Sequence, residues 1–412
     1  MNVVFIHQNF PAQFRHIAIR LAKDPSCQIM AICQGHAPKL AQIRSVVYSP
    51  ERKPTEGIHP YLASTEAHVI NGQAVAAALL RLTRTGFQPD VIFGHPGWGE
   101  LLYVKEVFPN VPLVGFFEFF YRTEGADVGF DAEYPATLSG RLRTRTMNAI
   151  HLLSLESADF GITPTRWQRS VFPVEFQHKL RLIHEGVDTE IAVPNPAALL
   201  QLPDGRTLSR RDEVVTYVAR NLEPYRGFHI LMRAVAEICR RRPNAQVLIV
   251  GGDGVSYSQR LPGGKSYREK LQAEISIDPK RVHFLGRIAY QQYIQLLQVS
   301  SAHIYLTVPF VLSWSMLEAM AAGCLVIGSD TAPVREVIRD GENGLLVDFF
   351  SPQAIADAVD RVLEAPDKLQ PLRDAARRRI VQSYTISQGI EAYQQLLAEI
   401  ARQPPATRGR RE

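Results

Sequence analysis

The chain has 412 residues, of which 46% are hydrophobic and 21% are charged, and its formal net charge is +5. This length exceeds what one hydrophobic core usually organises, so we expect two domains, and the composition excludes a disordered chain or a fibre. The basic excess suits a partner that carries phosphate or an anionic membrane surface. No nucleic-acid-binding motif accompanies it, so nucleic acid is not expected as a partner.

The four cysteines form no CxxC pair and no cluster with histidine at metal-binding spacing, which indicates free thiols in a reducing compartment. No run reaches the roughly 18 apolar residues that crossing a bilayer requires. The first residues, MNVVFIHQNF, reach polar side chains too early for a secretory signal. We therefore expect a cytoplasmic protein and leave open a peripheral contact with the inner face of a membrane.

Short apolar runs alternate with helical stretches along the first half of the chain. We expect helices at about 12–23 and 99–108, and strands in NVVFIHQ, QIMAICQG, VIFGH, VPLVGFF, ADFGITPT and KLRLIHEGV. Strands that alternate with helices predict βαβ units and a parallel, doubly wound sheet. We place the N-terminal lobe at residues 1–190.

A stretch rich in Pro, Arg and polar residues, 191–212, predicts a linker, after which the alternation restarts. Strands are expected in EVVTYVARN, AQVLIVGGDG, RVHFLGR, AHIYLTV, CLVIGS and GLLVDF. We place a second doubly wound lobe at 213–384, a last helix at 385–402 and a disordered tail at 403–412. Ligands of such sheets bind beyond the carboxyl ends of the strands, which predicts a site in a cleft between the lobes.

The strand exit YVARNLEPYRGFHIL (217–231) contains Arg220 and Arg226 on either side of a turn at Pro224. Guanidinium groups beside the start of a helix suit a diphosphate, because they act together with backbone N–H groups. The alternative is a surface loop with two solvated arginines, and the pattern alone does not decide between them.

Three other strand exits carry candidate ligand contacts. GGDGVSY (251–257), which includes Gly252 and Asp253, lacks the spacing of a dinucleotide or P-loop motif and more often marks a bend. In HPGWGE (95–100), His95 is either ligand-facing or a hydrogen-bonded structural residue. QNFPAQF (8–14) leaves the first strand with Pro11 and small residues, which allow a substrate to approach closely.

The segment PFVLSWSMLEAMAAG (309–323) predicts an almost wholly apolar helix from about Ser313, ended by Gly323. The N–H groups at its start, at about 311–314, favour an anion. Its one ionisable residue, Glu318, could accept two hydroxyl hydrogen bonds, as from a ribose. The alternative is an internal salt bridge from Glu318 to Arg287 or Arg335.

The order of these segments resembles the family 4 glycosyltransferases, which have the GT-B fold of two Rossmann-like lobes facing a central cleft. The resemblance is strongest over about 214–348, in YVARNLEPYRG, LIVGGDG, VHFLGR and LEAMAAGCLVIGSDTAPVREVIRDGENGLLVDF. It is looser in the N-terminal half, where QNFPAQF, His95 and HEGVDT (184–189) carry it. It implies that the last helix crosses back to the N-terminal lobe.

The resemblance assigns roles to individual residues of this chain. It implies that Arg220 and Arg226 hold the donor diphosphate, with Arg226 replacing the family's usual lysine. Glu318 corresponds to the second glutamate of the family's paired-glutamate motif and would bind the donor ribose. His95 would lie near the transferred sugar, and Arg287 lies where the nucleotide base is usually held.

Two features depart from the family pattern. Phe310 stands where the first glutamate of the pair, which contacts the transferred sugar, is expected; the segment resembles a bacterial subgroup with this replacement. Its contacts could come from backbone N–H groups of Val311 and Leu312, next to Ser313, or from Glu118. The loop QNFPAQF also lacks a Gly-Gly pair.

Acceptors bind the N-terminal lobe in this family, and the aromatic-rich segment 116–135 is the candidate wall. Aromatic clusters are more often core, and that alternative stays open. The candidate acceptor-side residues are Phe10, Pro11, Trp98 and Tyr121.

Together these features predict a retaining, hexosyltransferase-like enzyme that moves a sugar from a nucleotide-diphospho-sugar to a carbohydrate or lipid-linked acceptor. No DxD-type acidic cluster stands in a suitable place, so neither a metal nor a cofactor is expected. The alternatives are a sugar-nucleotide epimerase of similar fold and a non-catalytic sugar-nucleotide-binding protein, which the phenylalanine at position 310 would suit. A dinucleotide-dependent dehydrogenase is disfavoured by the missing fingerprint.

Overall fold

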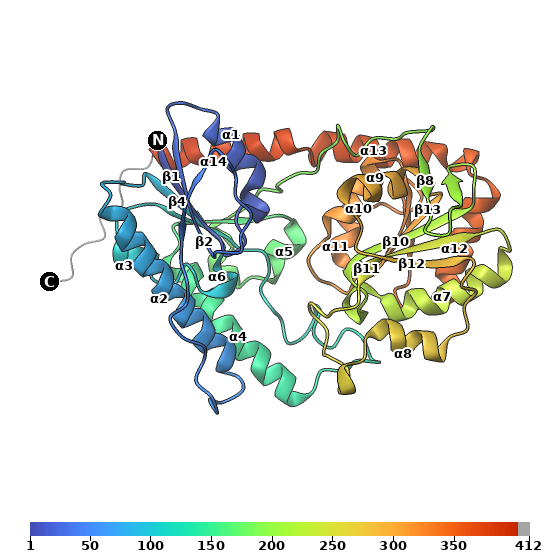
Figure 1. The fold of residues 1–412 in the computed structure, drawn as a ribbon, viewed down its shortest axis with the longest axis horizontal. Coiled ribbons are helices and arrows are strands. Elements are labelled where there is room, and N and C mark those ends of the chain that lie inside the picture. The colour runs from blue at the N-terminus through green and yellow to red at the C-terminus, as the bar shows by residue number, and fades with distance from the viewer. Residues whose placement is uncertain (403–412) are drawn as a thin grey trace. The chain divides into compact units, whose positions relative to one another are not determined.

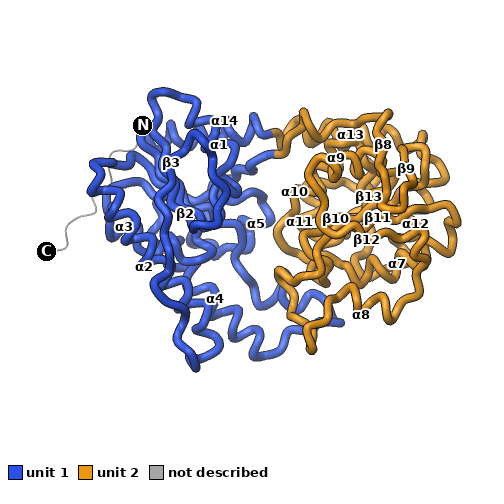
Figure 2. The backbone as a smooth tube through the Cα atoms, viewed as in Figure 1, with its two compact units in different colours: residues 1–186, 386–412 blue, residues 187–385 orange. Residues whose placement is uncertain are grey.

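The structure, a computed structural model, describes residues 1–402. The chain divides into two compact units (Figure 2): unit 1 joins residues 1–186 with the C-terminal segment that begins at Ile386, and unit 2 comprises Val187–Thr385. The tail predicted at 403–412 lies outside the described residues. No helix within residues 1–402 combines the length and hydropathy that crossing a membrane requires.

Unit 1 is built on a parallel sheet of seven strands in the order β3-β2-β1-β4-β5-β6-β7 (Figure 1). Its central strands are buried on both faces, which explains their near-continuous runs of Val, Ile and Phe. The strands are β1 (Asn2–Ile6), β2 (Gln28–Cys33), β3 (Arg44–Val47), β4 (Val91–Gly94), β5 (Leu113–Phe116), β6 (Phe160–Thr163) and β7 (Leu180–Leu182).

The helices of unit 1 include two long ones that sequence reasoning did not predict, α2 and α4. The predicted helix at 99–108 is mostly turns, because Gly99 takes a left-handed φ of 88° and only a short helix follows. The helices are α1 (Arg15–Ala22), α2 (Ala63–Thr83), α3 (Val104–Val107), α4 (Leu138–Ser157), α5 (Arg166–Val171), α6 (Val174–Gln177) and α14 (Ile386–Arg402), with 3₁₀ turns η1 (Ala12–Phe14) and η2 (Pro96–Trp98).

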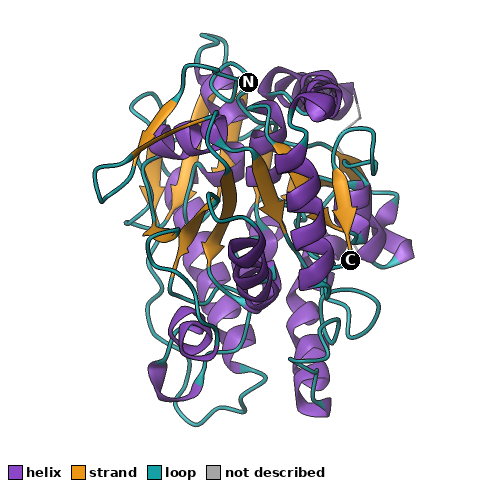
Figure 3. Cartoon of the chain, turned by 90° about the vertical axis from the view of Figure 1, so that its right-hand side faces the viewer, coloured by secondary structure: helices purple, strands orange, loops and turns teal. Residues whose placement is uncertain are grey.

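Unit 2 repeats this architecture with six parallel strands in the order β12-β11-β10-β13-β14-β15. Helices cover both faces of the strands (Figure 3). The strands are β10 (Val214–Asn221), β11 (Gln246–Gly252), β12 (Val282–Gly286), β13 (Ala302–Tyr305), β14 (Leu325–Ser329) and β15 (Leu345–Val347). The helices are α7 (Phe228–Arg241), α8 (Tyr267–Glu274), α9 (Tyr290–Val299), α10 (Trp314–Ala321), α11 (Ala332–Arg335), α12 (Pro352–Glu364) and α13 (Gln370–Ser383), with 3₁₀ turns η3 (Pro224–Arg226), η4 (Pro262–Gly264) and η5 (Asp367–Leu369).

Each sheet has a switch point, where successive crossovers run in opposite directions. In unit 1 it lies between β1 and β4, whose last residues Ile6 and Gly94 are partners across the sheet. In unit 2 it lies between β10 and β13. The segments that leave these paired strands therefore emerge side by side at the carboxyl edge, where such sheets bind ligands.

The stretch predicted as a linker, 191–212, is not one. It belongs to unit 2 and contains an antiparallel hairpin of β8 (Leu199–Gln201) and β9 (Thr207–Ser209). Leu200 and Leu208, which face each other across the hairpin, are buried in the core of unit 2. Alternate leucines specify this hairpin, and the density of Pro and Arg around them hides the period of two.

The last helix, α14, packs on unit 1 although its sequence follows unit 2, as the resemblance implied. Its buried stripe of Tyr393, Leu396, Leu397 and Ile400 joins the core that contains Phe5 and Phe14. An ion pair of 2.6 Å between Arg181 and Glu399 adds a polar contact at the edge of this face. The helix is therefore part of the hydrophobic core of unit 1.

Truncating this stripe should destabilise the protein. We expect Leu396→Ala to lower the free energy of unfolding by about 2–5 kcal/mol, because a buried leucine is removed and the site closes only partly. The matched change Leu199→Ala, at a side chain that is 58% exposed, should stay within about 0.5 kcal/mol. Urea denaturation measures both, and equal losses would contradict this role of α14.

Candidate active site

Two histidines stand at the switch point of unit 1. His7 directly follows β1 and His95 directly follows β4, and their ring centroids lie 5.3 Å apart. The ring of Trp98 lies 5.2 Å from His7 and 4.8 Å from His95. His7 was not among the residues predicted from the sequence, although VVFIHQ and VIFGHP show the same pattern of an apolar run that ends in histidine.

Backbone contacts set the protonation of both rings. The Nδ1 atom of His7 accepts a hydrogen bond from the N–H of Asn9 at 2.9 Å, and that of His95 accepts one from Gly97 at 3.0 Å. Each neutral ring therefore carries its hydrogen on Nε2. Burial lowers the pKa of His7 to about 4, and burial with neighbouring His7 lowers the pKa of His95 well below its ordinary value. Both rings are neutral donors at pH 7.

The carboxylate of Glu118 lies beside these histidines, just beyond the end of β5. Its Oε2 is 3.9 Å from His95 Nε2, and its Oε1 accepts a hydrogen bond from Gln13 at 3.4 Å. His95 Nε2 is buried and has no hydrogen-bond partner among the described residues, whereas the Glu118 side chain is 38% exposed. A buried N–H donor next to an accessible carboxylate suits a ligand that carries hydroxyl groups.

A second acid, Glu100, supports the loop that carries His7. It is fully buried, and its Oε1 accepts hydrogen bonds from the Tyr48 hydroxyl at 3.1 Å and from the N–H of Gln8 at 3.3 Å. Burial raises the pKa of Glu100 to about 7, against these hydrogen bonds. Glu100 therefore anchors the start of the β1–α1 loop. Sequence reasoning missed it, although it is the last residue of HPGWGE, a segment that was singled out.

The predicted acceptor-side residues divide into buried and half-buried ones. Phe10 is only 1% exposed and belongs to the core, and Pro11 is buried, so neither is the surface residue that the loop predicted. Trp98 and Tyr121 are half-buried, and the Tyr121 backbone exchanges two hydrogen bonds with the Asn148 side chain. The phenylalanines of the predicted acceptor wall are core residues too: Phe116, Phe117, Phe119 and Phe120.

In unit 2, a fixed guanidinium stands at the equivalent edge of the sheet. Arg226 Nη1 donates to Thr307 Oγ1 and the Val311 carbonyl, both at 2.9 Å, and to the Tyr305 hydroxyl at 3.3 Å. The next residue, Gly227, has a φ of 66°, and a Cβ there would lie 2.5 Å from Leu306 Cβ. This glycine lets the turn pack closely against the strand exit, which places Arg226.

Arg226 is one of three arginines without a carboxylate partner at this edge. Within residues 1–402, no acidic side chain forms an ion pair with Arg220, Arg226 or Arg287. Arg220, at the end of β10, is exposed, and Arg287 Nη2 donates to Asn221 Oδ1 at 3.4 Å. Positive charge without an internal partner at a sheet edge suits an anionic ligand.

The buried acid Glu223 lies in the same loop but is used by the backbone. Only 1% exposed, it accepts hydrogen bonds from the N–H groups of Ser256, Tyr257 and Ser258 at 3.2, 3.0 and 2.9 Å. It therefore fixes the loop that follows β11. Sequence reasoning missed it, although it stands inside NLEPYRG, the segment that was singled out.

Phe310, the unusual residue of the predicted site, is 2% exposed and lies under an aromatic cluster. Its ring meets Tyr257 at 4.7 Å and Tyr225 at 5.4 Å, both edge to face, and the Arg226 guanidinium lies 5.8 Å from its centroid. The phenylalanine thus supports Tyr257, which is 38% exposed, and does not itself present a surface.

Glu318 on α10 bonds to two tyrosines and not to an arginine. Its Oε1 accepts from the Tyr290 hydroxyl and its Oε2 from the Tyr293 hydroxyl, both at 2.8 Å. Arg335, offered as a salt-bridge partner, pairs with Asp330 instead. Burial raises the pKa of Glu318, and the two hydroxyl donors oppose that shift. No feature of the sequence had indicated the two tyrosines of α9.

The other predicted donor-side residues have mixed roles. Ser313 caps α10 by accepting from the N–H of Ser315 at 3.3 Å, and Leu312 is buried in the core. A Cβ on Gly252 would lie 2.9 Å from Asn221 Oδ1, so the glycine lets Asn221 approach. Asp253 is exposed and pairs with Arg268 at 3.3 Å.

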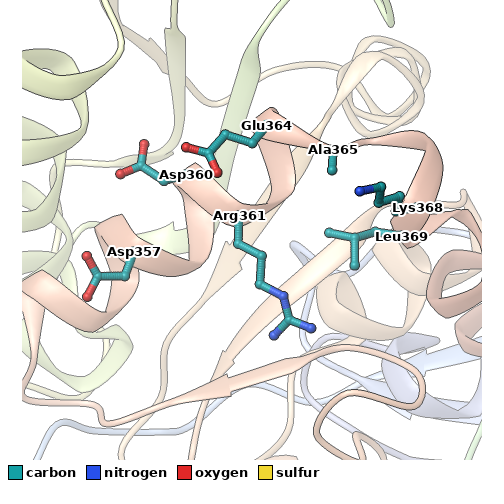
Figure 4. Close-up of a pocket in the computed structure, with 7 residues that line it drawn as sticks. All are labelled: Asp357, Asp360, Arg361, Glu364, Ala365, Lys368 and Leu369. Atoms are coloured by element: carbon teal, nitrogen blue, oxygen red, sulfur yellow. The ribbon is translucent and has the colours of Figure 1, made fainter.

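A cavity of about 480 Å³ lies elsewhere, beside the end of α12 (Figure 4). Three of its acids already pair with Arg241 and Arg242, at distances of 2.6 to 2.9 Å: Asp357, Asp360 and Glu364. The acidic side chains that line this cavity are therefore already part of an ion-pair network. Within the described residues, no group of three or more His, Cys, Asp or Glu is arranged to hold a metal.

Two doubly wound parallel sheets with polar groups at both switch points define an α/β protein of the GT-B type. Solved structures of similar fold include sucrose-phosphate synthase from Thermosynechococcus elongatus, with a TM-score of 0.75 and 19% identity, covering 97% of this chain and 99% of that one. Anabaena HepE in complex with UDP and glucose has a TM-score of 0.68 and 18% identity, covering 97% and 100%. The predicted fold class is confirmed.

The sequence matches two glycosyltransferase models in succession. Residues 25–192 match the glycosyl transferase family 4 group, and residues 204–379 match the glycosyl transferases group 1. A phosphatidyl-myo-inositol mannosyltransferase of Mycobacterium tuberculosis is 27% identical over 282 residues, covering 60% of this chain and 70% of that protein. The chain therefore belongs to the glycosyltransferases, and these matches do not favour the epimerase or the non-catalytic alternative.

The buried side chain of Glu100 makes the stability of the protein depend on pH. Because the pKa of Glu100 is raised from 4.5 to about 7, the folded state binds its proton more tightly than the unfolded state does. The stability that this proton contributes is full below about pH 4.5 and is lost as the pH rises through about 7. As the pH rises from 5 to 8, the free energy of unfolding of wild type should fall by on the order of 3 kcal/mol relative to that of Glu100→Gln.

Urea denaturation of the full chain at the two pH values measures this difference. Glu190→Gln, at an exposed position, is the matched control and should show no such change. A wild-type-to-variant difference that is the same at pH 5 and pH 8 would contradict the assignment.

Proposed function

We propose that the protein transfers a sugar from a nucleotide-diphospho-sugar to an acceptor hydroxyl, with retention of configuration at the anomeric carbon. The observation that carries the proposal is the set of guanidinium groups at the carboxyl edge of unit 2, Arg220, Arg226 and Arg287, which have no carboxylate partner within residues 1–402. A diphosphate supplies the negative charge that this edge lacks.

In this reaction the bond between the sugar's anomeric carbon and the diphosphate oxygen breaks, and a bond to the acceptor oxygen forms. Negative charge develops on the departing diphosphate oxygen, which takes up the proton that the acceptor hydroxyl loses. Arg226 is held by three acceptors before any ligand arrives, so stabilising that charge requires little reorganisation. Arg220, which is exposed, adds a second cation to the same group.

Glu318 is the proposed ribose acid. Both of its oxygens already accept hydrogen bonds from tyrosine hydroxyls, which shows that the carboxylate can hold a pair of hydroxyl donors. A carboxylate has about four acceptor positions, so the two hydroxyls of a ribose can be added to, or exchanged for, those of Tyr290 and Tyr293. Tyr290 is 48% exposed and is the partner that can move.

In this proposal, other residues take over the role of the glutamate that Phe310 replaces. Phe310 keeps Tyr257 and Arg226 in place, while hydroxyl recognition is assigned to Glu118 and His95 in unit 1. These two offer an accessible carboxylate and a neutral Nε2–H donor that has no partner within the described residues. His7 and Gln13 hold this pair from behind.

The acceptor is proposed to be a carbohydrate or lipid-linked alcohol. The relative named as a phosphatidyl-myo-inositol mannosyltransferase supports the lipid-linked class. We propose a cytoplasmic enzyme that uses no metal, because arginines can supply the cationic charge that the leaving group needs.

Substitutions in unit 2 test the donor site. We expect Arg220→Ala and Glu318→Ala each to weaken binding of the nucleotide-sugar by about 10- to 100-fold, since each removes charge-assisted hydrogen bonds. Isothermal calorimetry with the nucleotide-sugar that binds wild type measures the loss. The matched control is Arg240→Ala, an exposed arginine that pairs with Glu237, and it should bind as wild type does. If neither Arg220→Ala nor Glu318→Ala weakens binding, the donor site is elsewhere.

A chelator tests the proposed independence from metal. Turnover of the nucleotide-sugar, followed by release of the nucleoside diphosphate, should keep its rate after dialysis against EDTA. A loss of turnover that Mg²⁺ or Mn²⁺ restores would overturn the assignment of leaving-group stabilisation to the arginines.

A further inference from the structure

Helix α4 of unit 1 shows its apolar residues to solvent. Its exposed large side chains are leucines, at 64%, 48%, 39% and 56% exposure: Leu138, Leu142, Leu152 and Leu153. At about 100° per residue these four fall within an arc of about 100°, which also contains Arg145, Ala149 and Glu156, and they extend over about 22 Å of the helix. We call this surface the leucine face.

The opposite side of α4, which packs on the rest of unit 1, is partly polar. Asn148 is 7% exposed and exchanges hydrogen bonds with the Tyr121 backbone, and Ser154 is fully buried. Figure 1 shows α4 beside α2 along one side of the unit. Ile150 and Leu155 are buried on this side as well. A surface helix normally buries its leucines, whereas α4 leaves four of its five leucines exposed. An apolar stripe of this size on a surface marks an interaction site.

Basic side chains lie beside and within the leucine face. The first two turns carry Arg141, Arg143 and Arg145, and the one acid of α4 is Glu156, near its C-terminal end. Of the three arginines, Arg141 has an ion pair, a 3.6 Å contact with exposed Glu124, whereas Arg143 and Arg145 have none within the described part of the chain. The partner must therefore accept leucine side chains and also carry negative charge.

We propose that the leucine face of α4 docks on an anionic lipid bilayer. Leucines that enter the boundary between headgroups and acyl chains, with arginines at the phosphate level, form the pattern of an interfacial helix that lies in the plane of the membrane. A second copy of the chain is a poorer occupant, because α4 carries three arginines against one glutamate, so two such faces are both positive and repel each other. The proposal does not depend on sugar transfer.

Co-sedimentation of the full chain with vesicles tests this docking. Wild type should bind vesicles of phosphatidylcholine mixed with phosphatidylglycerol and lose binding in high salt or with phosphatidylcholine alone. The variant L142E/L153E and the variant R143E/R145E should each lower the partition coefficient more than about tenfold. These side chains are on the surface, and circular dichroism checks that the variants remain folded.

A matched control carries the same changes elsewhere. L199E/R339E alters a leucine that is 58% exposed and an arginine side chain that is 79% exposed, both in unit 2, and should bind vesicles as wild type does. No binding of wild type to anionic vesicles, or equal binding by all variants, would overturn the proposal. So would a dimer in the absence of lipid, detected by sedimentation velocity, that L142E/L153E abolishes, because the occupant would then be a second copy.

Discussion

One interaction underlies the proposed donor site: three oxygen acceptors from the β13 exit fix the Arg226 guanidinium. None of these acceptors is a carboxylate, so the side chain is held in place without its charge being neutralised. The same loop contains an acid, Glu223, but it is satisfied by three backbone N–H groups. A cation that is fixed yet uncompensated suits an anion, and this is the basis for the proposed diphosphate site.

At position 310 the chain has aromatic packing in place of the glutamate that the family pattern predicts. Phe310, Tyr225 and Tyr257 form one cluster against the guanidinium. A carboxylate at position 310 would stand beside Arg226 and cancel part of its charge, whereas a phenylalanine leaves that charge for the ligand. The replacement is thus consistent with the donor site proposed in unit 2, and hydroxyl recognition by Glu118 and His95 of unit 1 stays a separate proposal.

Sequence reasoning reached the fold because parallel strands buried on both faces are short apolar runs, which stand out along the chain. It also singled out Arg226, which lies in the turn after β10, and Glu318, which lies on α10; their roles toward a ligand stay predictions. It missed Tyr290, Tyr293 and Glu100, because their contacts join segments far apart in the chain. It misjudged 191–212, where Pro and Arg obscure a leucine hairpin, and Phe10, whose loop position suggested a surface residue although its ring is in the core.

The most direct test of the central claim is a crystal structure with a nucleoside diphosphate bound. We expect the diphosphate to contact the guanidinium groups of Arg220 and Arg226, and the ribose hydroxyls to reach the carboxylate of Glu318. A diphosphate bound away from these arginines, with Arg226 still in contact only with Tyr305, Thr307 and Val311, would contradict this expectation.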